Sequence, residues 1–140
     1  MKKSGLEFLH NPLFNKGTGF TKEEQKLLKI RGLVPPKSLP IEVQVEKVME
    51  NFHNKIDDME KYIFLSALQD RNETLFFKIL IDFLEELLPI VYTPTVGEAV
   101  RKYSLEVRKP RGLYISYEDR HKIREILKNR TNSDISLIVA

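Results

Sequence analysis

The chain has 140 residues, of which 41% are hydrophobic and 31% charged, a composition typical of a folded domain and not of a disordered tail. The absence of cysteine excludes disulfide bonds, thiolate nucleophiles and cysteine-ligated metal sites. The net charge is +3, and the basic excess lies in residues 98–140, which can attract an anion, although a solvated basic surface is the simpler interpretation.

The sequence shows no targeting or membrane segment. No apolar stretch approaches the roughly 20 residues that span a bilayer. The basic start, residues 1–5, lacks the apolar core of a signal peptide and is too short for a transit peptide. We therefore expect a cytoplasmic protein with no membrane partner.

Residues 5–20 are predicted to form a loop, because they combine Asn-Pro with Gly-Thr-Gly. Thr21 and Glu24 form a capping-box pattern that opens a short helix to about Ile30. Gly32 is expected to end that helix, and a proline-rich linker follows.

The next two helices are predicted from apolar spacing. Apolar side chains from Ile41 to Ile56 recur at helical intervals and indicate one buried face. Asp57 and Asp58 can end that turn and cap a third helix at about residues 59–69.

The helix over residues 73–88 has the strongest pattern in the chain. Asn72 is a suitable N-cap for it, and its wide apolar stripe indicates packing on more than one side. Pro89 is expected to end it, and residues 90–92 are β-prone. A second capping-box pattern predicts a helix from Thr95 to about Glu106.

The spacing of the apolar residues changes after residue 110. Residues 113–116 and 135–139 are predicted strands, and residues 119–129 a helix. The expected fold is therefore mainly α, with a helical bundle over 1–109 and the first β-α-β of an incomplete α/β domain over 110–140. Because two strands and one helix cannot cover a parallel sheet, the chain is expected to be truncated.

Two polar or rigid segments are candidates for function. Residues 69–73 place a polar Gln-Asp-Arg-Asn-Glu run between two apolar helices, where a capped, salt-bridged joint is the simpler interpretation. Residues 89–97 hold Tyr92 between two prolines, before a helix N-terminus, and a core tyrosine is the simpler interpretation there. The three histidines are isolated, without metal-ligand spacing.

Five stretches resemble segments of the malic enzymes, the decarboxylating malate oxidoreductases, and occur in the same order. The most specific is Pro-Ile-Val-Tyr-Thr-Pro-Thr-Val-Gly at residues 89–97. The similarity covers about residues 5–139 and implies the N-terminal part of such an enzyme. The five stretches are 11–21, 32–36, 61–63 together with 68–73, 89–97 and 108–116.

The resemblance implies roles for three residues. Tyr92 stands at the position of the family's general acid, which protonates enolpyruvate after decarboxylation, and a phenol keeps its proton at neutral pH. Arg71 matches an arginine of a dimer-interface site that binds an activating dicarboxylate in some animal members. Lys47, counted back from Lys61, stands where that site has a second arginine, and a lysine there weakens the case for this regulation.

The resemblance also implies what a complete enzyme does. It would convert malate and NAD or NADP to pyruvate, CO₂ and the reduced nucleotide with Mg²⁺ or Mn²⁺, as a homo-oligomer, expected to be a dimer, joined through its helical domain. No cofactor-binding or metal-binding residue can be assigned in these 140 residues. We therefore expect the chain alone to bind neither cofactor and to be inactive.

Two other functions remain open. The chain is alternatively a shortened, non-catalytic paralogue that acts as an oligomerisation module through its apolar helices. The basic stretch 101–130 suggests nucleic-acid binding by its charge, but it carries no binding motif, so we expect no nucleic-acid partner.

Overall fold

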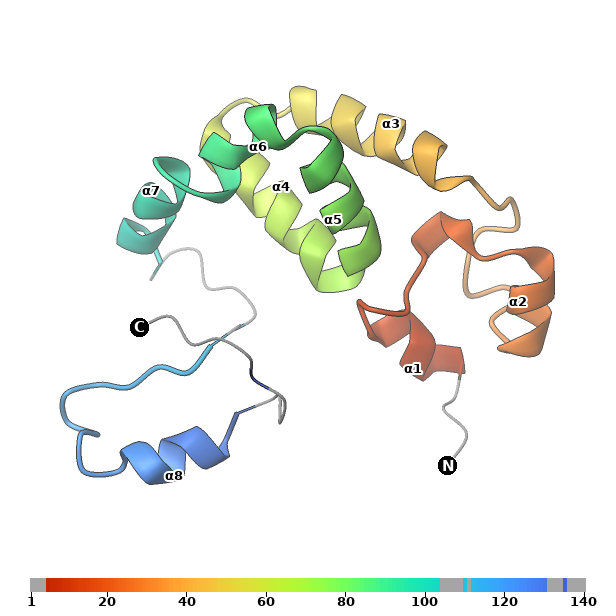
Figure 1. The fold of residues 1–140 in the computed structure, drawn as a ribbon. Coiled ribbons are helices and arrows are strands. Elements are labelled where there is room, and N and C mark those ends of the chain that lie inside the picture. The colour runs from red at the N-terminus through yellow and green to blue at the C-terminus, as the bar shows by residue number, and fades with distance from the viewer. Residues whose placement is uncertain (1–4, 104–109, 111, 131–134, 136–140) are drawn as a thin grey trace. The chain divides into compact units, whose positions relative to one another are not determined.

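Helices dominate the parts of the chain that the structure describes (Figure 1). The structure is a computed structural model that describes residues 5–103, 110, 112–130 and 135. The chain divides into two units, Met1–Glu106 and Val107–Ala140. The first unit contains α1 (Gly5–His10), η1 (Gly17–Gly19), α2 (Lys22–Leu27), α3 (Ile41–His53), α4 (Asp58–Arg71), α5 (Glu73–Asp82), α6 (Leu84–Val91) and α7 (Thr95–Arg101), and the second contains α8 (Ile123–Lys128).

The capping box that opens α2 is confirmed. The Glu24 N–H donates to Thr21 Oγ1 at 3.2 Å, and the Thr21 N–H donates to Glu24 Oε2 at 3.0 Å. The helix ends earlier than predicted, however, because Lys29 takes the left-handed conformation, with φ at 57°. The Ile30 N–H then donates to the Gln25 carbonyl, which closes the helix by the usual left-handed C-terminal motif. Ile30 itself is completely buried.

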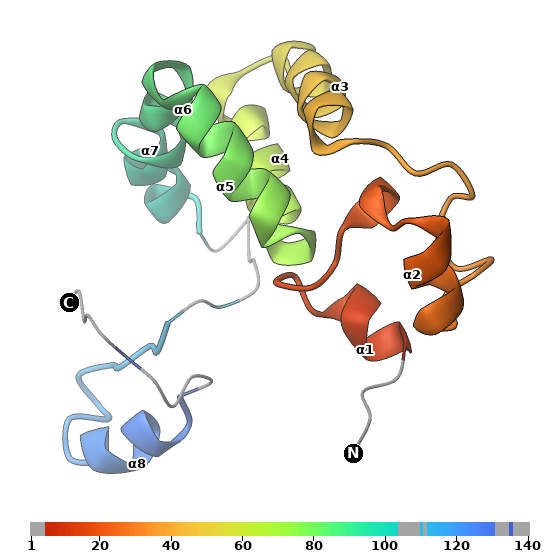
Figure 2. The same ribbon diagram turned by 45° about the vertical axis from the view of Figure 1, so that its right-hand side comes forward.

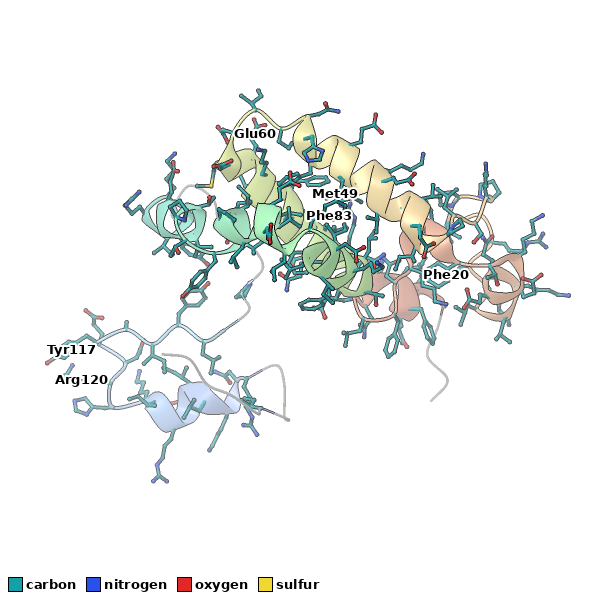
Figure 3. The ribbon with its side chains drawn as sticks, turned by 45° about the horizontal axis from the view of Figure 1, so that its top comes forward. Phe20, Met49, Glu60, Phe83, Tyr117 and Arg120 are labelled. Atoms are coloured by element: carbon teal, nitrogen blue, oxygen red, sulfur yellow. The ribbon has the colours of Figure 1, made fainter. Side chains whose placement is uncertain are left out.

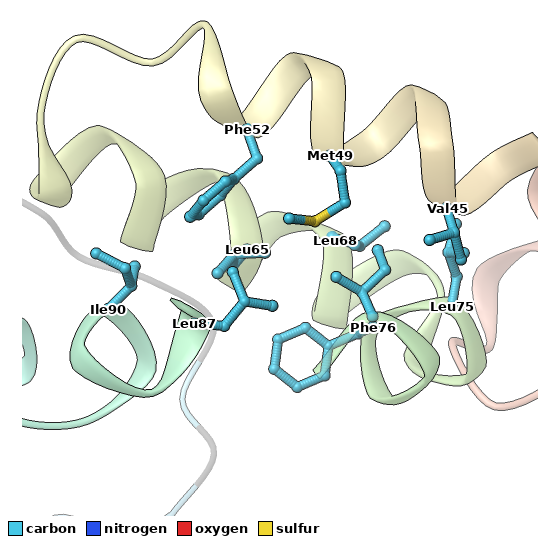
Figure 4. Packing of buried hydrophobic residues seen from close by; sticks show 10 residues of the cluster. Val45, Met49, Phe52, Leu65, Leu68, Leu75, Phe76, Leu87 and Ile90 are labelled. Atoms are coloured by element: carbon cyan, nitrogen blue, oxygen red, sulfur yellow. The ribbon is translucent and has the colours of Figure 1, made fainter. Parts of the chain in front are cut away.

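The core of the first unit lies between α3, α4, α5 and α6 (Figure 4). In two views α4 and α5 lie side by side, with α3 running along them, while α1 and α2 lie beyond the N-terminal end of α3 (Figures 1 and 2). Apolar side chains at helical spacing drive this packing, since each helix buries one stripe. The buried cluster contains Val45, Met49, Phe52, Leu65, Leu68, Leu75, Phe76, Ile79, Leu87 and Ile90.

Capping side chains set the ends of α4 and the start of α5, as the sequence predicted. Asp57 Oδ1 accepts from the Glu60 N–H at 2.8 Å, and Asn72 Oδ1 accepts from the Leu75 N–H at 3.0 Å. The Asn72 N–H itself closes the last turn of α4 on the Leu68 carbonyl at 2.8 Å. One residue therefore ends one helix and begins the next.

The single predicted helix over residues 73–88 is two helices. The chain turns at Phe83, with φ at −126° and ψ at 36°, and the second helix, α6, continues through Pro89 to Val91. The β-prone interpretation of residues 90–92 was therefore wrong. The turn has a packing reason, because it lets both α5 and α6 direct buried residues into one core, and Phe83 packs against that core.

Two further boundaries differ from the sequence predictions. Ile56, expected on the buried face of a longer helix, lies in the turn after α3 and is 89% exposed. Thr95 does not form a capping box, because it is the first helical residue of α7, has Pro94 as its N-cap and is buried. The helix expected to reach Glu106 ends at Arg101, and residues 104–106 lie outside the described residues.

The second unit does not confirm the predicted β-α-β. Residues 113–116 form no strand, and their side chains are exposed. A strand needs a neighbouring strand to pair its backbone groups, and no described residue provides one. The predicted helix at 119–129 is reduced to α8, preceded by a turn in which the Arg120 guanidinium stacks 4.4 Å from the Tyr117 ring (Figure 3). The second predicted strand, 135–139, lies outside the described residues except for Ile135.

Replacing Ile79 by Ala is expected to lower the free energy of unfolding by about 2–5 kcal/mol, because it leaves a cavity in a fully buried position. The matched control is Ile56→Ala in the turn after α3, which is 89% exposed and should change stability by less than about 0.5 kcal/mol. Urea denaturation of both variants measures the difference. Equal losses would contradict the placement of the core.

Replacing Asn72 by Ala should lower the free energy of unfolding by about 0.5–2 kcal/mol, because the first turn of α5 loses its side-chain acceptor. Replacing it by Ser keeps an oxygen at the cap and should retain most of that stability. Urea denaturation again gives the comparison, and an Ala variant as stable as the Ser variant would show that the cap contributes nothing.

Candidate functional site

Tyr92 lies on the surface, at the C-terminal end of α6. Its ring is 63% exposed, whereas Ile90 and Thr95 on either side of it are buried. Its backbone is held at both ends, because the Tyr92 N–H donates to the Leu88 carbonyl at 2.9 Å and its carbonyl accepts from the Val96 N–H at 2.8 Å. The simpler interpretation as a core tyrosine was therefore wrong, because Tyr92 lies on the surface of the described structure.

The residues that follow Tyr92 include exposed Thr93, Pro94 and Gly97. The Thr93–Pro94 peptide bond is cis, and α7 begins directly after it. A side chain at Gly97 would meet nothing within 4 Å. At the far end of α7, Glu98 accepts from Lys102 at 2.6 Å, and this hydrogen bond raises the pKa of Lys102.

Arg71 and Lys47, the two cations that the resemblance pairs, line one cavity of about 290 Å³. Arg71 is the last residue of α4, and Lys47 lies in the middle of α3. Both side chains belong to exposed residues, and the described residues of the cavity wall include no Asp or Glu. Two positive charges without a carboxylate between them make this cavity suited to an anion.

Two buried amides, Gln44 and Asn72, also line this cavity. Gln44 is 8% exposed and its Nε2 donates to the Leu39 carbonyl at 3.0 Å, while Asn72 is 4% exposed and its Oδ1 accepts from the Leu75 N–H. These partners fix the orientation of each amide, since only nitrogen can donate and only oxygen can accept. The atoms left to face the cavity are therefore Gln44 Oε1 and Asn72 Nδ2.

A second, larger cavity of about 740 Å³ adjoins the first through Gln44 and Asn72. Its wall is mostly apolar and includes Phe20, Leu28 and Ile41. Lys16 and Glu24 form an ion pair of 2.5 Å at this wall. The hydrogen bond from Lys16, followed by that from the Thr21 N–H, lowers the pKa of Glu24.

The sequence predictions missed Gln44 as a site residue. A signal was present, because Gln44 directly precedes Val45 on the buried side of α3, where a polar residue is uncommon. Asn72 was predicted only as a helix cap. Tyr92 lines neither cavity, so the structure brings Arg71 and Lys47 together but not with Tyr92.

Within residues 5–103, 110, 112–130 and 135, no group of three or more His, Asp or Glu side chains is placed to hold a metal ion. His53 instead pairs with Glu86, with 2.7 Å between Nε2 and Oε1. In the same part of the chain, no helix combines the length and apolar character required to cross a membrane.

Residues 69–140 match the family model described as malic enzyme, N-terminal domain. The chain is 51% identical over 138 residues to the NAD-dependent malic enzyme 3 of Bacillus subtilis, with 97% of this chain and 24% of that protein aligned. It is 48% identical over 137 residues to the NADP-dependent malic enzyme of Anas platyrhynchos, which covers 98% of this chain and 25% of the relative. The chain thus spans about a quarter of the length of these relatives.

The matched region contains Arg71 and Tyr92, and the alignments with the relatives extend over nearly all of the chain. The family model covers just over half of the 140 residues. This protein therefore belongs to the malic enzyme family.

Proposed function

We propose that this chain is the N-terminal part of a malic enzyme, which oxidatively decarboxylates malate to pyruvate and CO₂ with NAD or NADP in the cytoplasm. The observation that carries the proposal is the exposed phenol of Tyr92 on a backbone held at both ends, in a chain of this family. Residues 1–109 serve assembly and deliver Tyr92, and residues 110–140 begin the catalytic domain.

Tyr92 acts as the general acid of the reaction. Loss of CO₂ leaves the enolate of pyruvate, whose terminal carbon must gain a proton to become the methyl group. The Tyr92 O–H bond breaks as the new C–H bond forms, and the tyrosinate that remains is reprotonated before the next turnover. In the complete enzyme a divalent metal would supply Lewis-acid polarisation and a nicotinamide nucleotide would supply the hydride acceptor, and no residue of this chain is assigned to hold either.

The segment 110–140 completes its β-α-β only in the longer chain. Residues 113–116 are exposed and form no strand, although their sequence favours one. A sheet supplied by the remaining three quarters of a full-length relative would pair their backbone groups and cover their apolar side chains.

In a full-length enzyme that contains this sequence, Tyr92→Phe is expected to lower kcat by about 10²–10⁴-fold, the usual contribution of a general acid. The KM for malate should change little, because the substitution removes only a hydroxyl. Steady-state assays of nucleotide reduction measure both constants. Tyr117→Phe, in the turn before α8, is the control, and an unchanged kcat for Tyr92→Phe would refute the role.

The purified 140-residue chain should show no malate-dependent formation of NADH or NADPH with Mg²⁺ or Mn²⁺. The reason is that the family's base, metal ligands and nucleotide-binding domain are not assigned to any residue of this chain. Absorbance at the reduced-nucleotide band is the readout. Turnover above that of a buffer blank would overturn this expectation.

The Lys47–Arg71 cavity binds a dicarboxylate. Its two cations and its lack of a described carboxylate support this assignment, and a guanidinium can hold a carboxylate by two parallel hydrogen bonds. Arg71→Ala is expected to weaken succinate binding by about ten-fold or more, since a hydrogen bond to a charged group is lost. Titration calorimetry measures it, with Arg124→Ala in the second unit as the control, and equal affinities would exclude Arg71 from the site.

A second copy of this chain covers the exposed apolar side chains of α5 and α6. Phe77 and Ile81 share one face of α5, Leu84 and Leu88 share one face of α6, and each is at least 46% exposed. Such clustering favours an interface. The same surface supports the alternative function, in which the chain is a non-catalytic oligomerisation module.

Analytical ultracentrifugation should therefore find a dimer that Ile81→Glu dissociates, because a buried unpaired carboxylate is costly. The matched control is Ile56→Glu in the turn between α3 and α4, which should leave the dimer intact. A monomeric wild-type chain, or equal effects of both substitutions, would contradict an interface on α5 and α6.

A further inference from the structure

The helix α7 buries one side of its surface. Thr95 is 4% exposed and Ala99 is 7% exposed, and they lie on one face of the helix because they are four residues apart. Val100, on another side of α7, is 68% exposed. Since α7 contacts α4 and α6, the Thr95–Ala99 face is the side that packs against these two helices.

The same helix holds the backbone of Tyr92. The Tyr92 carbonyl accepts from the Val96 N–H of α7 at 2.8 Å, whereas the Tyr92 N–H donates to the Leu88 carbonyl of α6 at 2.9 Å. Val96 directly follows the buried Thr95 in the first turn of α7. A shift of α7 against α6 therefore moves the donor that holds the Tyr92 carbonyl.

The C-terminal end of α7 lies near the start of α4. Lys102 follows α7, and its Nζ donates to Glu98 Oε1 at 2.6 Å. This hydrogen bond and the charge of Glu98, and to a smaller extent the charge of Asp57, raise the pKa of Lys102. Because Asp57 is the N-cap of α4, its effect on Lys102 agrees with the packing of α7 against that helix.

Ala99 is the smaller of the two buried side chains of α7. The distance between the axes of two packed helices depends on the side chains at their contact. A single methyl group at position 99 lets α7 approach its neighbours closely. Because protein interiors are close-packed, two further carbon atoms at this position have to displace the helix.

We propose that Ala99 is a positioning residue for the proton transfer by Tyr92, an inference that rests on the general-acid role proposed above. Its small side chain seats α7 so that the Val96 N–H holds the Tyr92 carbonyl in place. Ala99 contacts no reacting atom and acts only through this hydrogen bond. A catalytic group misplaced by about 1 Å can lose about 100-fold in rate, so the volume of the side chain at position 99 affects the reaction.

Hydrogen exchange of the 140-residue chain tests how α7 is seated. Ala99→Val is expected to speed exchange of the Val96 amide by about ten-fold or more relative to the Ile79 amide, which reports on global unfolding. Val100→Leu enlarges a side chain on the exposed side of the same helix and should leave this ratio unchanged. A wild-type ratio in Ala99→Val would overturn the proposal.

Two partial reactions test the effect on chemistry in a full-length enzyme that contains this sequence. Exchange of the methyl protons of pyruvate for deuterium reverses the protonation step, because tyrosinate takes a methyl proton and the phenol returns a deuteron from D₂O. Reduction of oxaloacetate to malate by the reduced nucleotide reverses the hydride step, in which Tyr92 transfers no proton to carbon. Loss of folded enzyme lowers both rates equally, whereas misplacement of Tyr92 lowers only the first.

Ala99→Val is expected to slow deuterium exchange by about ten-fold or more and to keep oxaloacetate reduction within about two-fold of wild type. Ala99→Ser adds only one oxygen atom and should keep most of the exchange. Where circular dichroism shows that Ala99→Val is unfolded, Ala99→Cys replaces it, with an expected loss of about three-fold or more.

Equal losses in the two reactions would give Ala99 a structural role alone and overturn the proposal. The same conclusion would follow from equal effects of Ala99→Val and Val100→Leu. Tyr92→Phe separates this failure from that of the proposed function, because deuterium exchange that survives in Tyr92→Phe would refute the general-acid role itself.

Discussion

The arrangement of the first unit depends on one residue, Asn72, which lies between α4 and α5. Its backbone N–H closes the last turn of α4, and its Oδ1 caps the first turn of α5. The next residue, Glu73, donates its N–H to the Pro12 carbonyl at 3.0 Å and so ties the N-terminal segment to the same joint. The backbone N–H and Oδ1 of Asn72 are occupied by these hydrogen bonds, and its carbonyl accepts from the Phe76 N–H. Its Nδ2 is the polar atom that remains for the cavity.

This joint explains why a candidate binding cavity and a structural element coincide. Arg71 is brought to the cavity because α4 ends there, and Lys47 and Gln44 reach it from the facing turns of α3. The buried contacts of α3 with α4 and α5 hold these walls together. Tyr92 lies elsewhere, exposed at the C-terminal end of α6. The unit therefore presents two separate surfaces that carry different chemistry.

Sequence reasoning succeeded where local physics decides. The Thr21–Glu24 box, the Asp57 cap and the Asn72 cap all follow from short-range hydrogen bonds, and the apolar stripes identify the core. It failed where tertiary packing decides. The turn at Phe83 carries no glycine or proline, and Pro89 is accommodated inside α6. Lys29 takes a left-handed conformation that the sequence assigned to Gly32. Residues 113–116, predicted as a strand, do not form one.

The candidate site likewise has a part that the sequence predicted and a part that only the fold reveals. Its cations were named from the resemblance, but that they share a cavity with Gln44 and Asn72 follows only from the fold. The most direct measurement is a nuclear magnetic resonance titration of the ¹⁵N-labelled chain with succinate, which follows the side-chain amide of Asn72. A saturable shift of that resonance, with Asn54 in the turn after α3 unmoved, is the predicted result. An Asn72 resonance that stays unchanged while the backbone signals of Arg71 move would contradict the account.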